Sequence, residues 1–161
     1  MSDNSFQSPA LQVRQALWNL QGELLKSLKE EYDRQNGYES NPTEWFQVLM
    51  TSDKYMWMRE LTSLMADVDV MTELEFLTEQ HVAAARAEIE RLLFEQNPSD
   101  NEFARLYRDM LTSGMTLLPL HSQLKATLQH LPFKPFTKDQ AYAERKSWHE
   151  EHHHQAKKRR G

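Results

Sequence analysis

The residues of this chain that are best suited to chemistry lie near its end, where His149-Glu150-Glu151-His152-His153 matches the pattern H-E-x-x-H. In zinc peptidases two histidines one helical turn apart bind the metal, and the glutamate between them polarises the attacking water. The surroundings do not fit that chemistry. No carboxylate or imidazole follows His154 to complete a site, and the four cations at 157–160 would repel a bound dication. We therefore expect no peptidase activity and no bound cofactor.

A looser use of the same segment is metal chelation, because imidazole is a common ligand of Zn²⁺, Ni²⁺ and Cu²⁺. A metal-responsive protein is therefore an alternative function. The simpler interpretation is a solvated, partly helical tail whose histidines titrate near neutrality and change its charge with pH. We favour this solvated tail. The candidate metal ligands are His149, His152, His153 and His154.

Charge is distributed unevenly along the 161 residues. From Glu144 onward there are six basic and three acidic residues, which leaves 13 basic and 21 acidic residues in the body. Such a body repels phosphate backbones, so nucleic-acid contact is expected only at the basic end, where it would be non-specific and salt-sensitive. The chain has no cysteine, which excludes disulfides, thiolate zinc sites and cysteine catalysis.

One histidine of the body stands in the middle of an apolar pattern. His81 follows Leu77 by one helical turn and precedes Ala85 by one turn, so we expect a hydrogen-bonded histidine at the edge of the core. An enzyme whose site combines His81 with carboxylates of neighbouring helices is a further alternative. The acidic residues between Asp67 and Glu79 are expected to form a solvated face. Because no complete catalytic set is visible, we expect a protein without enzymatic activity.

Helical spacing indicates the fold. Four glycines are too few for a turn-rich β protein, and leucines, tryptophans and methionines recur at intervals of three and four residues. Ser8-Pro9 and Asn41-Pro42 are typical of helix starts, and Asn36-Gly37 is typical of a helix end. These patterns predict an all-α, single-domain helical bundle of about five main helices, followed by a polar C-terminal helix or tail.

Weaker boundary signals divide the rest of the chain. A capping box at 72–75 separates two helices, although one continuous helix is the alternative there. Asn97-Pro98 ends the second helix, and a further box at 99–102 starts the next. The prolines at 132 and 135 favour extended backbone. The expected organisation is a flexible N-terminus at 1–8, the helical bundle at 9–131, a connector with the start of the last helix at 132–143, and a charged tail rich in His, Lys and Arg at 144–161.

The stretch from Tyr55 to Met58 carries more apolar side chains than one helix face needs. If Trp57 lies on the buried seam of an α-helix, Met56 and Tyr55 lie about 100° and 200° away from it. Such a helix is either buried among several neighbours, which is the more frequent case, or presents an apolar surface to a partner. The candidate partner-binding residues are Trp45, Tyr55, Met56, Trp57 and Met58.

Together these observations favour a non-enzymatic, soluble helical protein that binds another protein or self-associates. An acidic residue stands near the start, where a signal peptide would have Lys or Arg, and no apolar h-region follows. No apolar run approaches the ~20 residues that a membrane span needs. We therefore expect a cytoplasmic location and no membrane contact.

Overall fold

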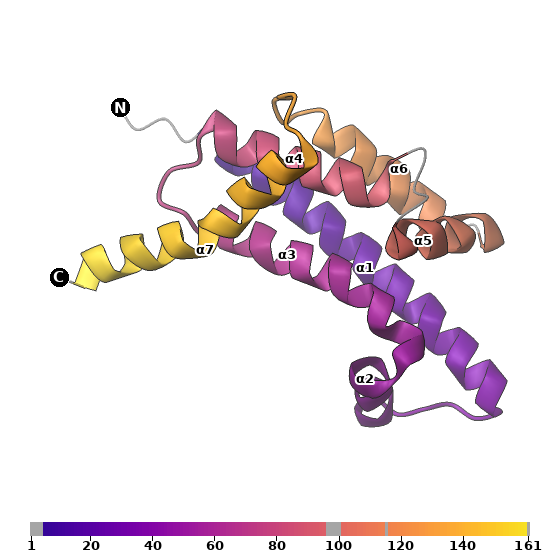
Figure 1. Cartoon of the computed structure of the whole chain (residues 1–161). Helices are drawn as coiled ribbons and strands as arrows, with labels where there is room; N and C mark the ends of the chain where they lie inside the picture. Colours follow the sequence, from indigo (N-terminus) through magenta and orange to yellow (C-terminus); the bar gives the residue numbers. More distant parts are fainter. Residues whose placement is uncertain (1–4, 96–100, 115, 161) are drawn as a thin grey trace.

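The computed structural model describes residues 5–95, 101–114 and 116–160. Within these ranges all regular structure is helical and there is no strand, so the prediction of an all-α, single-domain bundle is confirmed (Figure 1). None of the described helices has an apolar stretch that could cross a membrane. In chain order the elements are α1 (Gln7–Asn36), α2 (Pro42–Thr51), the 3-10 helix η1 (Asp53–Met58), α3 (Arg59–Thr72), α4 (Glu79–Leu93), α5 (Glu102–Ser113), α6 (Leu117–Leu128) and α7 (Lys138–Arg160).

α1 is the longest helix, and it packs against both α3 and α6, which lie below and above it in Figure 1. Its apolar stripe from Val13 to Leu28, which has the spacing of three and four residues noted in the sequence, is buried along its length. The predicted end is also confirmed, because Gly37 adopts a left-handed conformation with φ 75° and its N–H donates to a carbonyl of the last turn. The predicted cap at Ser8 is wrong: the helix begins at Gln7, so Ser8 lies inside the first turn.

α2 and η1 form a corner between α1 and α3. Asn41 caps α2 as predicted, accepting a hydrogen bond from the Glu44 N–H at 2.9 Å. Ser52 caps η1 in the same manner, accepting from the Lys54 N–H at 3.3 Å. The structure differs from the expectation of an α-helical seam here, since η1 is a 3-10 helix with about three residues per turn. Side chains three residues apart therefore lie on the same face, so Tyr55 and Met58 are both buried and Trp57 is only half-buried.

The predicted break after Thr72 is confirmed, because α3 ends there and α4 begins at Glu79. The capping box lies six residues later than predicted, however. The His81 N–H donates to the Thr78 hydroxyl at 3.2 Å, and the Thr78 N–H donates to His81 Nδ1 at 3.0 Å. The histidine thus takes the place that glutamate or glutamine usually has in this motif. The predicted boundaries at 97–98 and 99–100 lie outside the described residues, and Asn101 caps α5.

α7 corrects the expectation of a solvated tail. It continues as one helix to Arg160 and packs against α3 and α4, and only its last turns project beyond the body (Figure 1). Trp148 is fully buried and Arg145 is nearly so. The last recorded contact with the body is at Gln155, whose side-chain oxygen accepts the Glu75 N–H at 2.8 Å. The buried face of α7 is short and comprises Ala141, Arg145 and Trp148.

An aromatic cluster joins the end of α4 to α5 and α6. The His121 ring lies 4.5 Å from Phe94 and 5.6 Å from Tyr107 between centroids, and its Nδ1 is 2.8 Å from the Tyr107 hydroxyl. Burial, and then the nearby charge of Lys125, hold the pKa of His121 below its ordinary value of 6.5. Burial likewise raises the pKa of Tyr107. Both side chains are therefore neutral when the cluster is packed at neutral pH.

We expect this cluster to make the protein less stable in mild acid. Because the pKa of His121 is lower in the folded state, the unfolded chain takes up the proton first as the pH falls below about 6.5, and the free energy of unfolding decreases. Urea unfolding at pH 7.5 and 5.5 measures this loss. The variant Tyr107→Phe/His121→Leu has no imidazole at this position and should lose less stability between the two pH values. An equal loss in both proteins would contradict the assignment.

Candidate functional site

The predicted partner surface is divided between core and solvent. Trp45, Tyr55 and Met58 are buried, and the Trp45 ring packs between the rings of Tyr32 and Tyr55 at centroid distances of 5.6 and 5.3 Å. For these three residues the core interpretation, which the sequence also allowed, is the correct one. They hold the α2–η1 corner onto α1 and do not form part of an open surface.

Two of the predicted residues do reach the surface. Met56 is 41% exposed, and Trp57 is half-buried against Phe103, with ring centroids 5.4 Å apart. Sequence reasoning missed their exposed neighbours on α2, Phe46 at 62% and Met50 at 54%. Their spacing of four residues places both on one face of α2, which was a usable signal. We call this area the α2–η1 surface, and it comprises the exposed Phe46, Met50 and Met56 with the half-buried Leu49 and Trp57.

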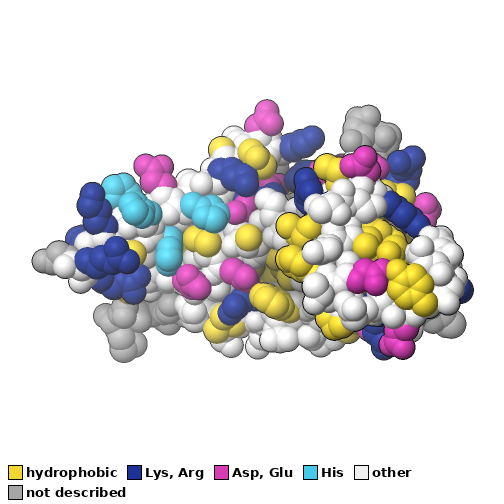
Figure 2. Space-filling model, turned by 90° about the horizontal axis from the view of Figure 1, so that it is seen from below, with side chains coloured by type: hydrophobic (Ala, Val, Ile, Leu, Met, Phe, Trp, Pro, Cys, Tyr) yellow, Lys and Arg dark blue, Asp and Glu magenta, His cyan; other side chains and the backbone are white. Residues whose placement is uncertain are grey.

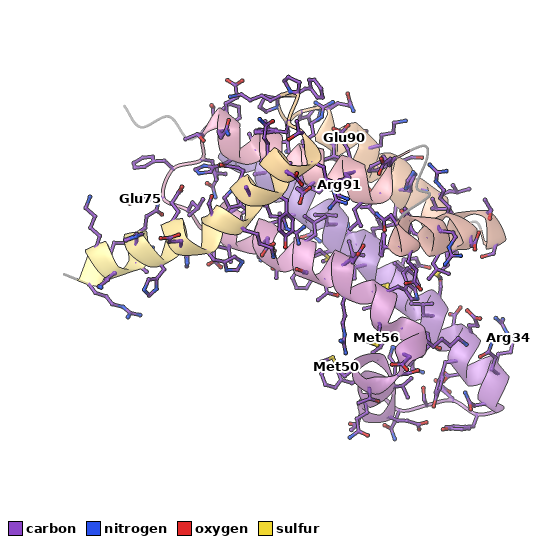
Figure 3. All side chains as sticks on the ribbon, in the orientation of Figure 1. Arg34, Met50, Met56, Glu75, Glu90 and Arg91 are labelled. Atoms are coloured by element: carbon purple, nitrogen blue, oxygen red, sulfur yellow. The ribbon has the colours of Figure 1, made fainter. Side chains whose placement is uncertain are left out.

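The α2–η1 surface lies at one end of the molecule. Figure 2 shows apolar side chains gathered over the end where α2 faces the viewer, and Figure 3 shows Met50 and Met56 beside one another at the α2–η1 corner. Arg59 ties this corner to α3, because its guanidinium donates to the Met50 carbonyl at 3.1 Å. The apolar side chains are thus presented on a backbone that the core and this hydrogen bond hold in place.

A second cluster of functional groups lies where α7 crosses α3 and α4, and Arg145 is its centre. Arg145 Nε donates to Asp67 of α3 at 2.5 Å, Nη1 donates to Glu88 of α4 at 3.1 Å, and Nη2 donates to the Ser63 hydroxyl at 3.2 Å. Asp67, Glu88 and Arg145 are all buried. The expectation of a solvated acidic face is therefore wrong for Asp67, although Glu73, Glu75 and Glu79 are exposed as expected.

Further basic side chains surround this buried group. Lys146 and His149 approach Asp67 at 3.2 and 2.5 Å, and Arg91 Nε donates to Glu88 at 3.1 Å. Burial alone would raise the pKa of Asp67, but the hydrogen bonds from His149 and Arg145 outweigh it and the pKa is lower than 3.8. Asp67 is consequently charged at neutral pH, and both buried carboxylates contact basic side chains of α7 or α4.

The candidate histidines mainly serve the docking of α7. His81 Nδ1 accepts from Thr78, so Nε2 carries the proton and faces the Glu151 carboxylate of α7 at 3.1 Å. His149 is bound to Asp67, and His152 Nε2 lies 3.3 Å from Glu73. His153 and His154 are exposed.

The contacts of these histidines are structural ones within the described part of the chain. Among the described residues, no group of three or more His, Asp or Glu side chains is placed to hold a metal ion. Both ring nitrogens of His81 are engaged in the contacts above, which leaves neither available to a substrate. Loose chelation by His149, His152, His153 and His154 stays a prediction.

The fold and these contacts define an all-helical protein with an apolar end surface and a charged seam that attaches its last helix. Comparison with models of known protein families, with characterised proteins and with solved structures finds no match. Its function is therefore argued from its own surfaces.

Proposed function

We propose that the protein binds another protein through the α2–η1 surface and has no catalytic role of its own. The observation that carries this proposal is the exposure of Phe46, Met50 and Met56, at 62%, 54% and 41%, on one corner of the fold. Apolar side chains that are exposed together gain free energy when a partner covers them. Aromatic and methionine side chains are also enriched in protein interfaces.

The charges near this surface favour a basic partner. Residues 39–60 carry four acidic side chains and two basic ones, which gives a net charge of −2. A second copy of this chain would bring the same negative charge, whereas a partner with lysines or arginines around an apolar stripe would be attracted. Methionine adapts its shape to different surfaces. We therefore propose an amphipathic helix with basic edges as the bound element.

The first test uses the protein itself with a synthetic amphipathic helical peptide that has leucines on one face and lysines along its edges. The methyl signals of Met50 and Met56 should shift on titration, and the other methionine signals should move little. Phe46→Ser/Met50→Ser should weaken binding about tenfold or more, because exposed apolar anchors carry much of the affinity of small interfaces. Leu118→Ser is the matched control, since Leu118 is an exposed apolar residue of α6.

Equal binding by the wild type and Phe46→Ser/Met50→Ser would contradict the proposal, as would shifts spread over all methionines. Sedimentation of the free protein distinguishes self-association from partner binding. If the wild type is a dimer and Phe46→Ser/Met50→Ser is a monomer, the partner of this surface is a second copy of the chain and not a basic helix. A pull-down from native extract with the same three proteins then identifies the partner, which should be captured by the wild type and by Leu118→Ser alone.

A further inference from the structure

A pocket of about 300 Å³ lies between the start of α3, the end of α4 and the first turns of α7. Its walls include four cations, which come from all three helices, and Glu60 is the only acidic residue among the residues that line it. Figure 3 shows Arg91 on α4, near the first turns of α7. The cations that line the pocket are Arg59, Arg91, Arg145 and Lys146.

The charge of this pocket is positive even after its buried counter-charges are included. Asp67 and Glu88 contact Arg145, and with Glu60 they give three negative charges against the four cations. The balance is +1, on a chain whose net charge is −5. A small anion that enters the pocket is therefore attracted, although the total charge of the protein is negative.

The guanidinium groups of Arg145 and Arg91 have N–H donors that the contacts described above do not use. Arg145 has five N–H donors, and its contacts with Asp67, Glu88 and Ser63 use three of them. These contacts also fix the direction of its guanidinium plane. Arg91 uses its Nε toward Glu88, which leaves the fork of its two terminal nitrogens toward the pocket that it lines. Planar forks of this kind match the oxygens of a phosphate group.

The remaining wall is aromatic. Tyr142 is half-exposed and lines the pocket, and its ring lies 5.7 Å from the Arg145 guanidinium and 5.4 Å from the Lys146 ammonium. The two cations hold this ring at the wall of the pocket. A planar group attached to a phosphate would therefore find a stacking surface next to the phosphate.

We propose that this pocket binds a small phosphorylated compound that carries a planar ring. Arg91 and Lys146 hold the phosphate, Arg145 forms the fixed floor, and Tyr142 contacts the ring. The volume is at the lower end of the range for small-molecule sites, which suits a ligand of about mononucleotide size. The pocket is separate from the proposed partner surface, because Phe46, Met50 and Met56 do not line it.

Titration calorimetry in buffer of low ionic strength at pH 7.5 tests this proposal with adenosine monophosphate, inorganic phosphate and adenosine. Adenosine monophosphate should bind at one saturable site, and more tightly than either of the others. Lys146→Gln and Arg91→Gln should each weaken it about tenfold through the loss of one charged contact. Tyr142→Leu should reduce its affinity to that of inorganic phosphate. Arg105→Gln, which removes an exposed cation of α5, is the control and should bind normally.

Melting temperatures check that each variant is folded. If Arg91→Gln does not fold, the affinity of Lys146→Gln alone tests the proposal, because the Lys146 side chain is 41% exposed and its replacement should leave the fold intact. Absence of saturable binding would overturn the proposal. The proposal would also be overturned if adenosine monophosphate bound no more tightly than inorganic phosphate. An equal loss of affinity in Arg105→Gln would overturn it as well, because it would indicate diffuse attraction to cations. The failure of this experiment would not bear on the α2–η1 surface, since none of the three pocket variants changes a residue of that surface.

Discussion

Replacing Arg145 with methionine is expected to lower the free energy of unfolding by about 3–5 kcal/mol. Methionine keeps much of the apolar stem of the side chain. It removes the guanidinium, however, and so leaves the carboxylates of Asp67 and Glu88 buried with fewer cations. Urea unfolding at pH 7, followed by circular dichroism, measures the change.

Two further variants show whether buried charge is the cause. Arg145→Met/Asp67→Leu/Glu88→Met replaces the whole buried group with apolar side chains and should recover much of the loss. Arg14→Met breaks an ion pair with Asp69 that lies near the surface and should cost less than about 1 kcal/mol. If Arg145→Met costs no more than Arg14→Met, the buried group does not hold α7 in place.

Trp148→Ala should have an effect of similar size, about 3–5 kcal/mol, because it removes the largest fully buried side chain of α7. The loss should be local as well as global. Since Trp148 lies between the seam at Arg145 and the contacts at Glu151 and His152, amide exchange along α7 should accelerate before that of α1. Hydrogen exchange read by mass spectrometry measures this order.

The matched variants for this position are Trp148→Phe and Trp18→Ala. Trp148 Nε1 has no hydrogen-bond partner among the described residues, so phenylalanine loses only packing and should be milder than alanine. Trp18 is about half-exposed, and its replacement should cost less than about 1 kcal/mol. Equal effects of Trp148→Ala and Trp18→Ala would contradict the burial of α7. The same reasoning means that truncation after Ser147 would remove part of the core and is not a neutral test of the tail.

The fold could be predicted because its signals are local. The buried stripe of α1 is visible as leucines three and four residues apart. Gly37 has no Cβ to oppose the left-handed conformation that ends α1, and Asn41 has a side chain that caps α2. The capping box of α4 was missed because His81, and not a glutamate, accepts the hydrogen bond from the backbone N–H of the N-cap residue there. Helix existence therefore followed from the sequence, while one boundary depended on an unusual residue.

The position of α7 could not be predicted in this way. Its polar composition indicates solvent exposure when the helix is considered alone. Arg145 is buried only because Asp67 and Glu88, which are 78 and 57 residues away, meet it on two other helices. The exposed residues of α2 were missed for a related reason: both faces of that helix are apolar, and only the packing of Trp45 on α1 decides which face remains open.

The projecting end of α7 gives the molecule a pronounced electric dipole. Beyond Gln155, four cations at 157–160 continue on the helix away from a body in which acidic residues outnumber basic ones. A particle with this distribution turns its tip toward any anionic support and can adhere end-on while its total charge is negative. Adhesion in that orientation would leave the opposite end, with its methionines and Phe46, pointing into solution.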